Sequence, residues 1–594
     1  MFNIKKLIEK EIKQKIFEKY QKSPDSFGII FQTPKKGYIC DFTILLFNLQ
    51  KQLDVETEEI KNFILDVLYN INYDKIKLIK EVKFINGFLN ITLSDEIIFE
   101  LFIDNDLLFE TQKGNSVVEF SSPNTNKPLH LGHLRNNFIG YSISKLLDTT
   151  GNKTLKVQII NDRGIHICKS IAAWLESANG KSPEDEGLKG DKFVGKYYVE
   201  YEKIYQQQIL DLQIESLTLE EAKIKAPILL KAKELLLKWE SGDKEILSVW
   251  SKMNSWVYDG FNQTYAKLGI VFDKNYYESQ TYLLGKNEIL KGLDQGIFVK
   301  KQDGSIWVDL TEYGLNEKVL LRSDGTSLYL TQDIGTAIER HKELNFDQMM
   351  YVVGDEQDHH FNVLFATLKK LGFKWADKLK HISYGMVNLP TGKMKSREGT
   401  IVDADDLIDK MIGIVSEKTK DLNKLSDLNE EDLLKINQQI ALGALKYFIL
   451  KVNPKKTMLF NPEEAIDLQG NTGPFIQYTC VRINSLIKKF EDGVSEVFIY
   501  PPKYVLSQQE RNLINKLLSY KELLTDAKTK LDPSMVCSYC YELACLFNKF
   551  YETSFIVKEQ DLLIKNLRMQ LTFETKKVLN SLLDILGIEV PIKM

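Results

Sequence analysis

Apolar residues follow three different patterns along the 594-residue chain and divide it into three parts. Residues 1–110 combine helical spacing, as in MFNIKKLIEKEIKQKIF, with short strand-like runs such as GFLNITL, and end at a polar turn before Gly114. Residues 111–405 alternate strand and helix patterns, and residues 406–594 are almost wholly helical. These patterns predict an N-terminal α/β module, a central α/β domain and a C-terminal α-helical bundle.

The central part opens with a strand (SVVEF), a polar loop (SSPNTNKP), a helix that begins around His130 and a second strand (TLKVQII). This order predicts a Rossmann-like parallel sheet, whose ligands lie beyond the carboxyl ends of the strands. Residues 170–265 are mostly helical and charged, so we expect a helical insertion there. Strand patterns return in SIWVDL, KVLLRS, DQMMYVVG and ISYGMVNL, and we expect them to complete the sheet.

Composition narrows the class of protein. A formal net charge of −4 with 43% hydrophobic residues describes a folded, soluble chain. The six cysteines are too few and too scattered for a disulfide framework, which favours a reducing cytoplasm. Cys537 and Cys540 lie in an apolar helical pattern without a second Cys/His pair, so we expect core packing and no structural zinc. No apolar run approaches the roughly 20 residues of a membrane span, so we expect no membrane partner.

The sequence His130-Leu131-Gly132-His133 stands at a predicted helix start, where backbone N–H groups and the helix dipole favour anions. His130 and His133 can donate hydrogen bonds to oxygens that gain charge as pyrophosphate leaves, and Gly132 lets adenine pack on the backbone. The alternative is a chance pair of histidines with structural hydrogen bonds. This motif alone supports both interpretations about equally.

A second motif, NLPTGKMKSREGTIV, follows the last predicted strand. It places Lys393, Lys395 and Arg397 in a loop bounded by glycines, where such cations can close over a triphosphate. A solvated run of charges is the simpler interpretation of this loop when it is taken by itself.

Together, the two motifs resemble the two signatures of class I aminoacyl-tRNA synthetases. The flanking sequences EFSSPNTNKPLHLGHLRNNFIG, LRSDGTSLYLTQDIGTA and GNTGPFIQYTCVRI are similar to those of arginyl-tRNA synthetases, and the similarity extends over essentially the full length. The resemblance implies adenylation of L-arginine by ATP, with Mg²⁺ on the triphosphate, and transfer of arginine to the 3′ end of tRNA(Arg). It also implies an ATP site formed by His130, Gly132, His133, Lys393, Met394 and Ser396.

An arginine side chain presents a planar fork of N–H donors, so its pocket needs carboxylates and other acceptors. In the family, the positions that hold the amino acid match Glu119, Asn124, Tyr329, Asp333 and Gln357, and the resemblance implies the same role here. Tyr329 and Asp333 stand at i,i+4 on a predicted helix, and Asp333 is the first candidate for the guanidinium. Without the resemblance, loop, core and surface roles would be the simpler interpretations.

Two stretches depart from the family pattern. Ser396 stands where the class signature has its second lysine. Similar synthetases carry a substitute lysine three residues before the first histidine, which here is Lys127, and Lys395 is a second candidate. The predicted catalytic residues are therefore Lys127, His130, His133, Lys393 and Lys395. The stretch QIINDRGIHIC differs from the Gly-Asp-Trp-Gly type of sequence in relatives, so Asp162 and His166 receive no role.

The remaining parts are expected to bind tRNA. Phe475 and Tyr478 follow the Gly-Pro break in GNTGPFIQY and can stack on unpaired bases, although helical aromatics usually belong to a core. The resemblance implies anticodon contacts by these two residues and by Met594. It further implies that the N-terminal module holds the tRNA elbow, with Phe88 and Asn90 as candidates.

Two alternatives stay open at this point. One is a class I synthetase for lysine, which is the hardest amino acid to separate from arginine on chemical grounds. The other is a non-catalytic tRNA-binding paralogue, which would have lost signature residues that this chain retains. We expect a monomer.

Overall fold

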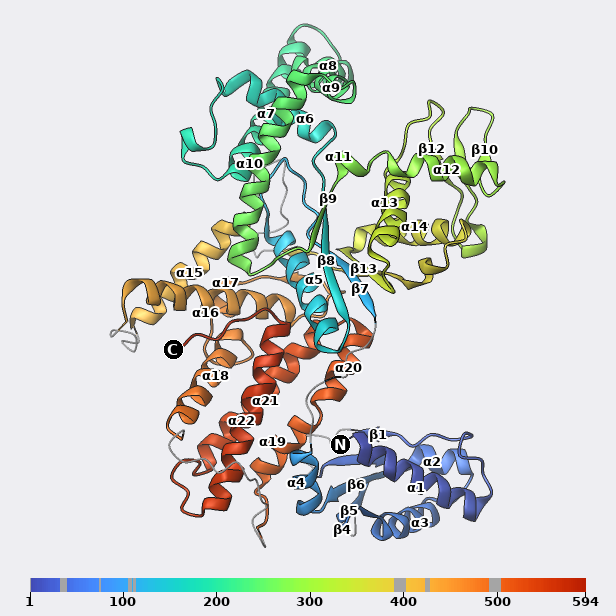
Figure 1. Ribbon diagram of the computed structural model, residues 1–594, viewed down its shortest axis with the longest axis vertical. Coiled ribbons are helices and arrows are strands. Elements are labelled where there is room, and N and C mark those ends of the chain that lie inside the picture. Colours follow the sequence, from blue (N-terminus) through green and yellow to red (C-terminus); the bar gives the residue numbers. More distant parts are fainter. Residues whose placement is uncertain are drawn as a thin grey trace. The chain divides into compact units, whose positions relative to one another are not determined.

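The computed structural model of the protein describes residues 2–32, 40–73, 76–104, 109, 114–388, 402–421, 428–490 and 504–594. The chain divides into two compact units, each made of segments that lie far apart in the sequence (Figure 1). The first unit consists of Met1–Phe109, Tyr478–Asp526 and Ser538–Leu582. The second consists of Glu110–Gln477, Ala527–Cys537 and Leu583–Met594.

The first unit contains the predicted N-terminal α/β module. An antiparallel sheet of order β1-β2-β6-β5 packs with amphipathic helices. Helix α1 buries Ile4, Ile8, Ile12 and Ile16, which repeat every fourth residue and so share one face. The elements are α1 Phe2–Tyr20, β1 Phe31–Gln32, β2 Phe42–Leu45, α2 Leu46–Leu53, α3 Thr57–Asn70, β3 Asn72–Tyr73, β4 Ile76–Lys77, β5 Ile79–Ile85, β6 Phe88–Leu93 and α4 Asp95–Ile103.

Part of the predicted C-terminal helical bundle, Tyr478–Asp526 and Ser538–Leu582, supplies the rest of the first unit. The helices that contribute to these segments are α18 Gly473–Lys488, α19 Gln508–Leu518, α20 Tyr520–Lys530, α21 Pro533–Thr553 and α22 Leu562–Ile585. The buried Arg511 of α19 joins the helices to the module, because its guanidinium forms ion pairs with Asp41 (2.6 Å) and Asp95 and donates to the Leu93 carbonyl. Cys537 and Cys540 are buried core residues with free thiols.

The second unit is built on the predicted parallel sheet. Its order is β14-β13-β7-β8-β9, with β7 Asn115–Glu119 in the centre between β13 Gln348–Gly354 and β8 Lys153–Ile160. The outer strands are β9 Lys274–Tyr277 and β14 Leu379–Tyr384. Chain connections leave β7 on one side through α5 Leu131–Thr149 and reach β13 on the other, so the carboxyl end of β7 is a topological switch point.

Part of the predicted sheet composition is wrong. SIWVDL and KVLLRS form strands, β11 Ile306–Val308 and β12 Lys318–Leu321, but these pair with β10 Val299–Lys300 in a separate antiparallel sheet. The parallel sheet instead gains β9, which has no strong apolar alternation. An alternating pattern indicates that one face of a strand is buried, but it does not indicate which sheet the strand joins.

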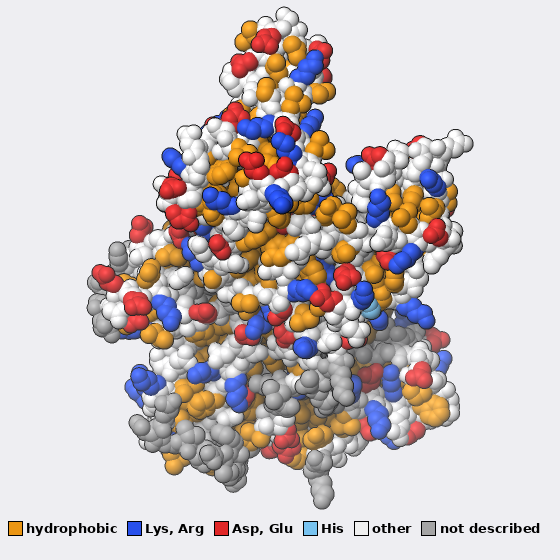
Figure 2. Space-filling model, turned by 45° about the horizontal axis from the view of Figure 1, so that its top comes forward, with side chains coloured by type: hydrophobic (Ala, Val, Ile, Leu, Met, Phe, Trp, Pro, Cys, Tyr) orange, Lys and Arg blue, Asp and Glu red, His pale blue; other side chains and the backbone are white. Residues whose placement is uncertain are grey.

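The predicted helical insertion lies between β8 and β9. It consists of α6 Ile165–Ser177, α7 Gly190–Ile214, α8 Leu219–Lys225, α9 Pro227–Glu240 and α10 Lys244–Leu268. On the face drawn in Figure 2, basic and acidic side chains alternate over these helices at the top, with hydrophobic ones between them. The drawn face of the insertion is therefore of mixed charge, in keeping with the small net charge of the chain.

Four helices lie between β9 and β14 in the sequence: α11 Glu278–Thr281, α12 Leu284–Asp294, α13 Tyr329–Leu344 and α14 Asp358–Lys370. The elements that follow β14 are β15 Val387–Asn388, α15 Ala404–Asp421, α16 Glu430–Leu450, β16 Met458–Leu459 and α17 Pro462–Ala465. Helices α15 and α16 pack on α5, so the unit that holds the sheet continues to Gln477. The domain limits predicted at 110 and 405 stay predictions.

Candidate nucleotide and amino-acid site

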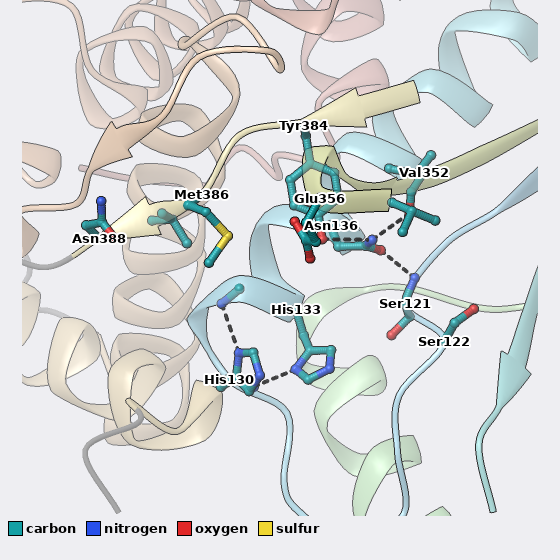
Figure 3. A pocket seen from close by; sticks show the side chains of 14 residues that line it. Ser121, Ser122, His130, His133, Asn136, Val352, Glu356, Tyr384, Met386 and Asn388 are labelled. Atoms are coloured by element: carbon teal, nitrogen blue, oxygen red, sulfur yellow. Dashed lines mark hydrogen bonds between the residues drawn. The ribbon is translucent and has the colours of Figure 1, made fainter. Parts of the chain in front are cut away.

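The two histidines of the first motif lie at the start of α5, as the sequence predicts. His130 is the N-cap, and its Nδ1 accepts a hydrogen bond from the Gly132 N–H (3.1 Å). His133 accepts through Nδ1 from the His130 N–H (3.2 Å), and the two ring centroids are 3.9 Å apart (Figure 3). Since each Nδ1 is an acceptor, a neutral ring carries its proton on Nε2. Both rings thus hold an N–H donor that the helix itself does not use.

Burial keeps these rings uncharged. It lowers the pKa of His130 to about 3 and the pKa of His133 well below its ordinary value, and the Lys127 cation adds to both shifts. A neutral imidazole pair at a helix N-terminus donates hydrogen bonds to phosphate without the cost of burying two further cations.

A cavity of about 360 Å³ lies in front of the histidines, at the carboxyl ends of β7, β13 and β14. A volume of this size suits a nucleotide-sized ligand. The lining residues come from strand ends and from α5, and they are Ser121, Ser122, His130, Gly132, His133, Asn136, Val352, Val353, Gly354, Glu356, Tyr384, Met386, Val387 and Asn388. The cavity therefore occupies the switch point of the sheet.

Asn136 is a residue of this site that the sequence analysis missed. Its side-chain amide accepts from the Ser121 N–H and donates to the Val352 carbonyl (2.7 Å) and to the Tyr384 hydroxyl (3.2 Å), as Figure 3 shows. One side chain thus connects the ends of three neighbouring strands. Its position one turn after His133 on the helix was the available signal.

Lys127 lies just before the histidines. Its side chain is half-buried, burial lowers its pKa, and its charge acts on both rings. Within the described ranges, its ammonium group has no carboxylate partner and no hydrogen bond, so it is available to an anion in front of the rings.

The second motif, with Lys393, Met394, Lys395 and Ser396, lies outside the described residues. The described residues on each side of it are Asn388 and Val402. Asn388 lines the wall, and Val402 accepts a hydrogen bond from the Leu131 N–H (3.2 Å) beside the first motif.

The residues predicted to bind the substrate arginine lie on β7, in the loop after β7, on α13 and on the short helix η3 Asp355–Gln357. Glu119 ends β7 and is buried, not a surface charge, and it forms an ion pair with Arg340 of α13. Burial raises the pKa of the Glu119 carboxyl, and the Arg340 guanidinium opposes that shift. The negative charge of Asp333 also raises the pKa of Glu119.

Asp333 and Tyr329 lie one turn apart on α13, as predicted. Tyr329 is 75% exposed, which excludes a core role. The Asp333 carboxylate contacts His360 Nε2 at 2.6 Å, and His360 follows Gln357 by one helical turn in the η3 Asp355–Gln357 and α14 segment. Asn124 is exposed in the loop after β7, where it forms a bridge to Asn161. No contact joins Asn124 to the other four residues in the part of the chain that the structure describes.

A further carboxylate, Glu278, was missed by the sequence analysis. It begins α11 directly after β9, and its pKa is raised to about 7, mainly by burial and further by the charges of Asp162 and Asp333, while Arg163 opposes the shift. Three carboxylates, Glu119, Glu278 and Asp333, thus share one electrostatic environment. The signal was weak because β9 itself was not predicted.

Asp162 and His166 form hydrogen bonds with neighbouring side chains and backbone groups of the fold. The Asp162 carboxylate accepts from the Ser279 N–H (2.8 Å), the Ser279 hydroxyl (2.7 Å) and the Tyr258 hydroxyl (3.0 Å). His166 contacts the Tyr198 hydroxyl at 3.1 Å. Asp162 therefore fixes the turn that carries Glu278, and neither residue lines the cavity.

The residues predicted to contact tRNA differ in how deeply they are buried and in which groups they contact. Phe475 and Tyr478 are half-buried on α18, and the Arg482 guanidinium lies over the Tyr478 ring at 5.1 Å. Asn90 is only 6% exposed, and its amide donates to the Lys83 carbonyl (3.3 Å) inside the module sheet. Asn90 is thus already used in the sheet, which favours a structural role over the predicted tRNA contact.

Phe88, at the start of β6, and Met594 are both half-buried. The chain end is anchored at Glu589, whose carbonyl accepts from Gln477 of α18 (2.7 Å).

The described ranges contain no group of three or more His, Cys, Asp or Glu side chains that could hold a metal ion. Among the helices described, none is both long and apolar enough to cross a membrane.

Comparison with known proteins agrees with this geometry. Residues 99–461 match the family of tRNA synthetases class I (R), catalytic domain, and residues 476–594 match the DALR anticodon binding domain. The arginine–tRNA ligase of Flavobacterium psychrophilum is 45% identical over 95% of this chain and 96% of its own, and that of Amoebophilus asiaticus is 43% identical over 99% of both. The arginyl-tRNA synthetase structure from Thermus thermophilus shares the fold, with a TM-score of 0.78 at 23% identity over 99% of this chain and 100% of the other. This chain therefore belongs to the arginyl-tRNA synthetase family of class I aminoacyl-tRNA synthetases.

Proposed function

We propose that the protein uses ATP to adenylate L-arginine and then transfers arginine to the 3′ end of tRNA(Arg). The observation that carries this proposal is one cavity at the sheet's switch point, with neutral histidine donors on one side and a group of carboxylates at the neighbouring strand ends. The first side suits the triphosphate of ATP, and the second suits a guanidinium.

In the first step, a carboxylate oxygen of arginine attacks the α-phosphorus of ATP, and the bond from that phosphorus to the bridging oxygen of pyrophosphate breaks. Negative charge grows on the phosphate oxygens as this bond lengthens. The Nε2–H groups of His130 and His133 and the ammonium of Lys127 are proposed to stabilise that charge. Lys393 and Lys395 are proposed to add further cations, with Met394 and Ser396 contacting ATP.

The ATP is proposed to enter as its magnesium complex. Glu356 is the only carboxylate in the described cavity lining, so the phosphates and water supply most of the oxygen ligands that Mg²⁺ prefers.

The arginine pocket is proposed to centre on Asp333. His360 contacts one oxygen of this carboxylate, and Glu278 adds negative charge in its ionised form. The Glu119–Arg340 ion pair has no net charge and is proposed to shape the pocket. Tyr329, one turn before Asp333 on α13, and Gln357, one turn before His360, are proposed to contact the same arginine, and Asn124 is proposed to contact its α-amino group. A neutral substrate of the same length would leave the Asp333 carboxylate without a guanidinium partner, and a site that hydrogen-bonds such a group discriminates against substrates that lack it.

In the second step, a ribose hydroxyl at the 3′ end of tRNA attacks the arginyl carbonyl carbon, and AMP leaves. Phe475, Tyr478 and Met594 are proposed to contact the anticodon, and Phe88 the tRNA elbow. Base stacking on half-exposed aromatics next to an arginine fits single-stranded RNA. We further propose a monomer located in the cytoplasm, where the six free thiols would stay reduced.

The test is ATP–pyrophosphate exchange and tRNA charging with each of the amino acids, with tRNA(Arg) present. We expect exchange with arginine alone. Exchange with lysine and not with arginine would contradict the proposal, and the variant Asp333→Asn should raise the KM for arginine while leaving the KM for ATP unchanged.

A further inference from the structure

The helical insertion contacts the nucleotide site in more than one place: the Tyr265 hydroxyl of α10 shares a hydrogen bond with the Ser121 hydroxyl (2.7 Å), and α7 meets the loop before α5 at Gly195. A Cβ atom built there would lie 2.7 Å from Pro128 Cδ, 3.5 Å from Lys127 Cα and 3.7 Å from Pro128 N. The helix backbone itself therefore packs against the loop, and no side chain fits between them.

A glycine at this position has a cost. Inside a helix, glycine is less stable than alanine by about 1 kcal/mol. The close approach explains why the smaller residue is nevertheless required. The loop cannot easily yield either, because the proline ring fixes the backbone angle φ at Pro128.

Buried charges hold α7 in this place. Lys189, the residue before the helix, pairs with Asp405 (2.6 Å) and with Asp191 (3.0 Å), and all three are largely buried. The residue before Asp405 is Ala404, whose N–H donates a hydrogen bond to the Leu129 carbonyl (2.9 Å). The start of α7 is thus tied, through Asp405 and Ala404, to Leu129 just before the histidine motif.

We propose that Gly195 is a positioning residue for Lys127. Its close approach sets the backbone of Lys127 and Pro128, and so directs the Lys127 ammonium toward the space in front of His130 and His133. The insertion thereby acts on the chemistry of the nucleotide site through packing. This inference rests on the proposed role of Lys127 in stabilising the departing pyrophosphate.

The variant Gly195→Ala tests the contact. It adds one methyl group that must push the loop away by a fraction of an ångström, and small misplacements of catalytic groups are costly. We expect a loss of about tenfold in the kcat of arginine-dependent pyrophosphate exchange, with little change in the KM for arginine. Gly413→Ala is the matched control, because Gly413 is exposed on α15 and has nothing within 4 Å of its Cβ position. It should change kcat by less than about twofold.

A double-mutant cycle separates positioning from general damage. In a Lys127→Met background, Gly195→Ala should have almost no further effect on kcat, because the group it displaces is already absent. A full tenfold loss in both backgrounds would overturn the inference while leaving the role of Lys127 intact. If Lys127→Met leaves kcat unchanged, the proposed role of Lys127 fails, and the inference fails with it.

Folding is checked by thermal unfolding of each variant. Should Gly195→Ala prevent folding, the double variant Pro128→Ala, Gly195→Ala removes the clashing ring atom and restores space for the methyl group. Its kcat should match that of Pro128→Ala alone. A tenfold lower value would show that the Pro128 contact is not the route of the effect.

Discussion

At the scale of single residues, the site works through protonation states that burial imposes. His130 and His133 are neutral donors because they are buried next to a cation, and Lys127 is a cation without a partner in the described ranges. Each property depends on the surroundings of the side chain, and each can be changed one residue at a time.

Lys127 gives the first prediction. Lys127→Met should lower the kcat of adenylation by roughly 100-fold and leave the KM for arginine nearly unchanged, since its contact strengthens as pyrophosphate departs. Steady-state pyrophosphate exchange with tRNA present measures both constants. A raised KM with unchanged kcat would mean that Lys127 acts in substrate binding instead.

The histidines give a prediction about stability and pH. In the unfolded chain a histidine takes up a proton near pH 6.5, whereas in the folded chain the pKa of His130 is about 3 and that of His133 is well below its ordinary value. The unfolded state therefore binds more protons below about pH 6.5, and the folded state loses stability as the pH falls, by up to about 1.4 kcal/mol per pH unit for each histidine.

Denaturant unfolding at about pH 7 and about pH 5 measures this effect. His133→Asn keeps an acceptor for the His130 N–H and removes one titrating group. Between these two pH values, the free energy of unfolding of the variant should therefore fall by about 2 kcal/mol less than that of the unmodified protein. The raised pKa of Glu278 acts in the opposite direction, and the comparison of the two proteins cancels it. Equal losses in both proteins would show that His133 is not kept neutral by folding.

At the scale of elements, the site depends on how strand ends are held around α5. The parallel strands end at the cavity with polar backbone groups, and Asn136 binds the groups of β7 and β13 and the Tyr384 hydroxyl of β14. The helix therefore contributes to the site twice, because its first turn lines the cavity proposed for ATP and its second turn connects the strands of the cavity wall.

Removing that brace gives a prediction with an internal control. Asn136→Ala leaves a buried N–H and a buried carbonyl unpaired and should lower the free energy of unfolding by about 2 to 4 kcal/mol. The neighbouring Asn137 is fully buried, and its amide atoms have no hydrogen-bond partner in the described part of the chain. Asn137→Ala should therefore cost clearly less. Equal costs, measured by denaturant unfolding, would contradict the bracing role.

At the scale of the whole molecule, each compact unit combines distant parts of the sequence. In the first unit, the N-terminal module and the C-terminal helices share Arg511, whose two aspartate partners are nearly inaccessible. A buried ion pair of this kind is costly to break, because the charges left behind stay desolvated.

Arg511→Met should accordingly destabilise the first unit by about 3 to 5 kcal/mol. Hydrogen exchange should increase in β2 and β6, and the KM for tRNA should rise if the module holds tRNA as proposed. Lys5→Ala is the matched control, since the Lys5–Glu522 pair joins the same two parts at an exposed position (3.3 Å) and should contribute less than about 1 kcal/mol. Unchanged exchange in the strands of the Arg511 variant would refute the coupling.

The sequence by itself determined the family, the helix start at His130, the face shared by Tyr329 and Asp333, and the parallel sheet around β7, because these follow from local spacing and from motifs. It did not determine which strands share a sheet, and β11 and β12 went to another sheet. Only the tertiary structure decided that Arg340 pairs with Glu119, that Glu278 lies in the field of Asp333, and that Gly195 meets Pro128. These contacts join residues far apart in the sequence, and they depend on how elements cross in space, which a one-dimensional pattern does not encode.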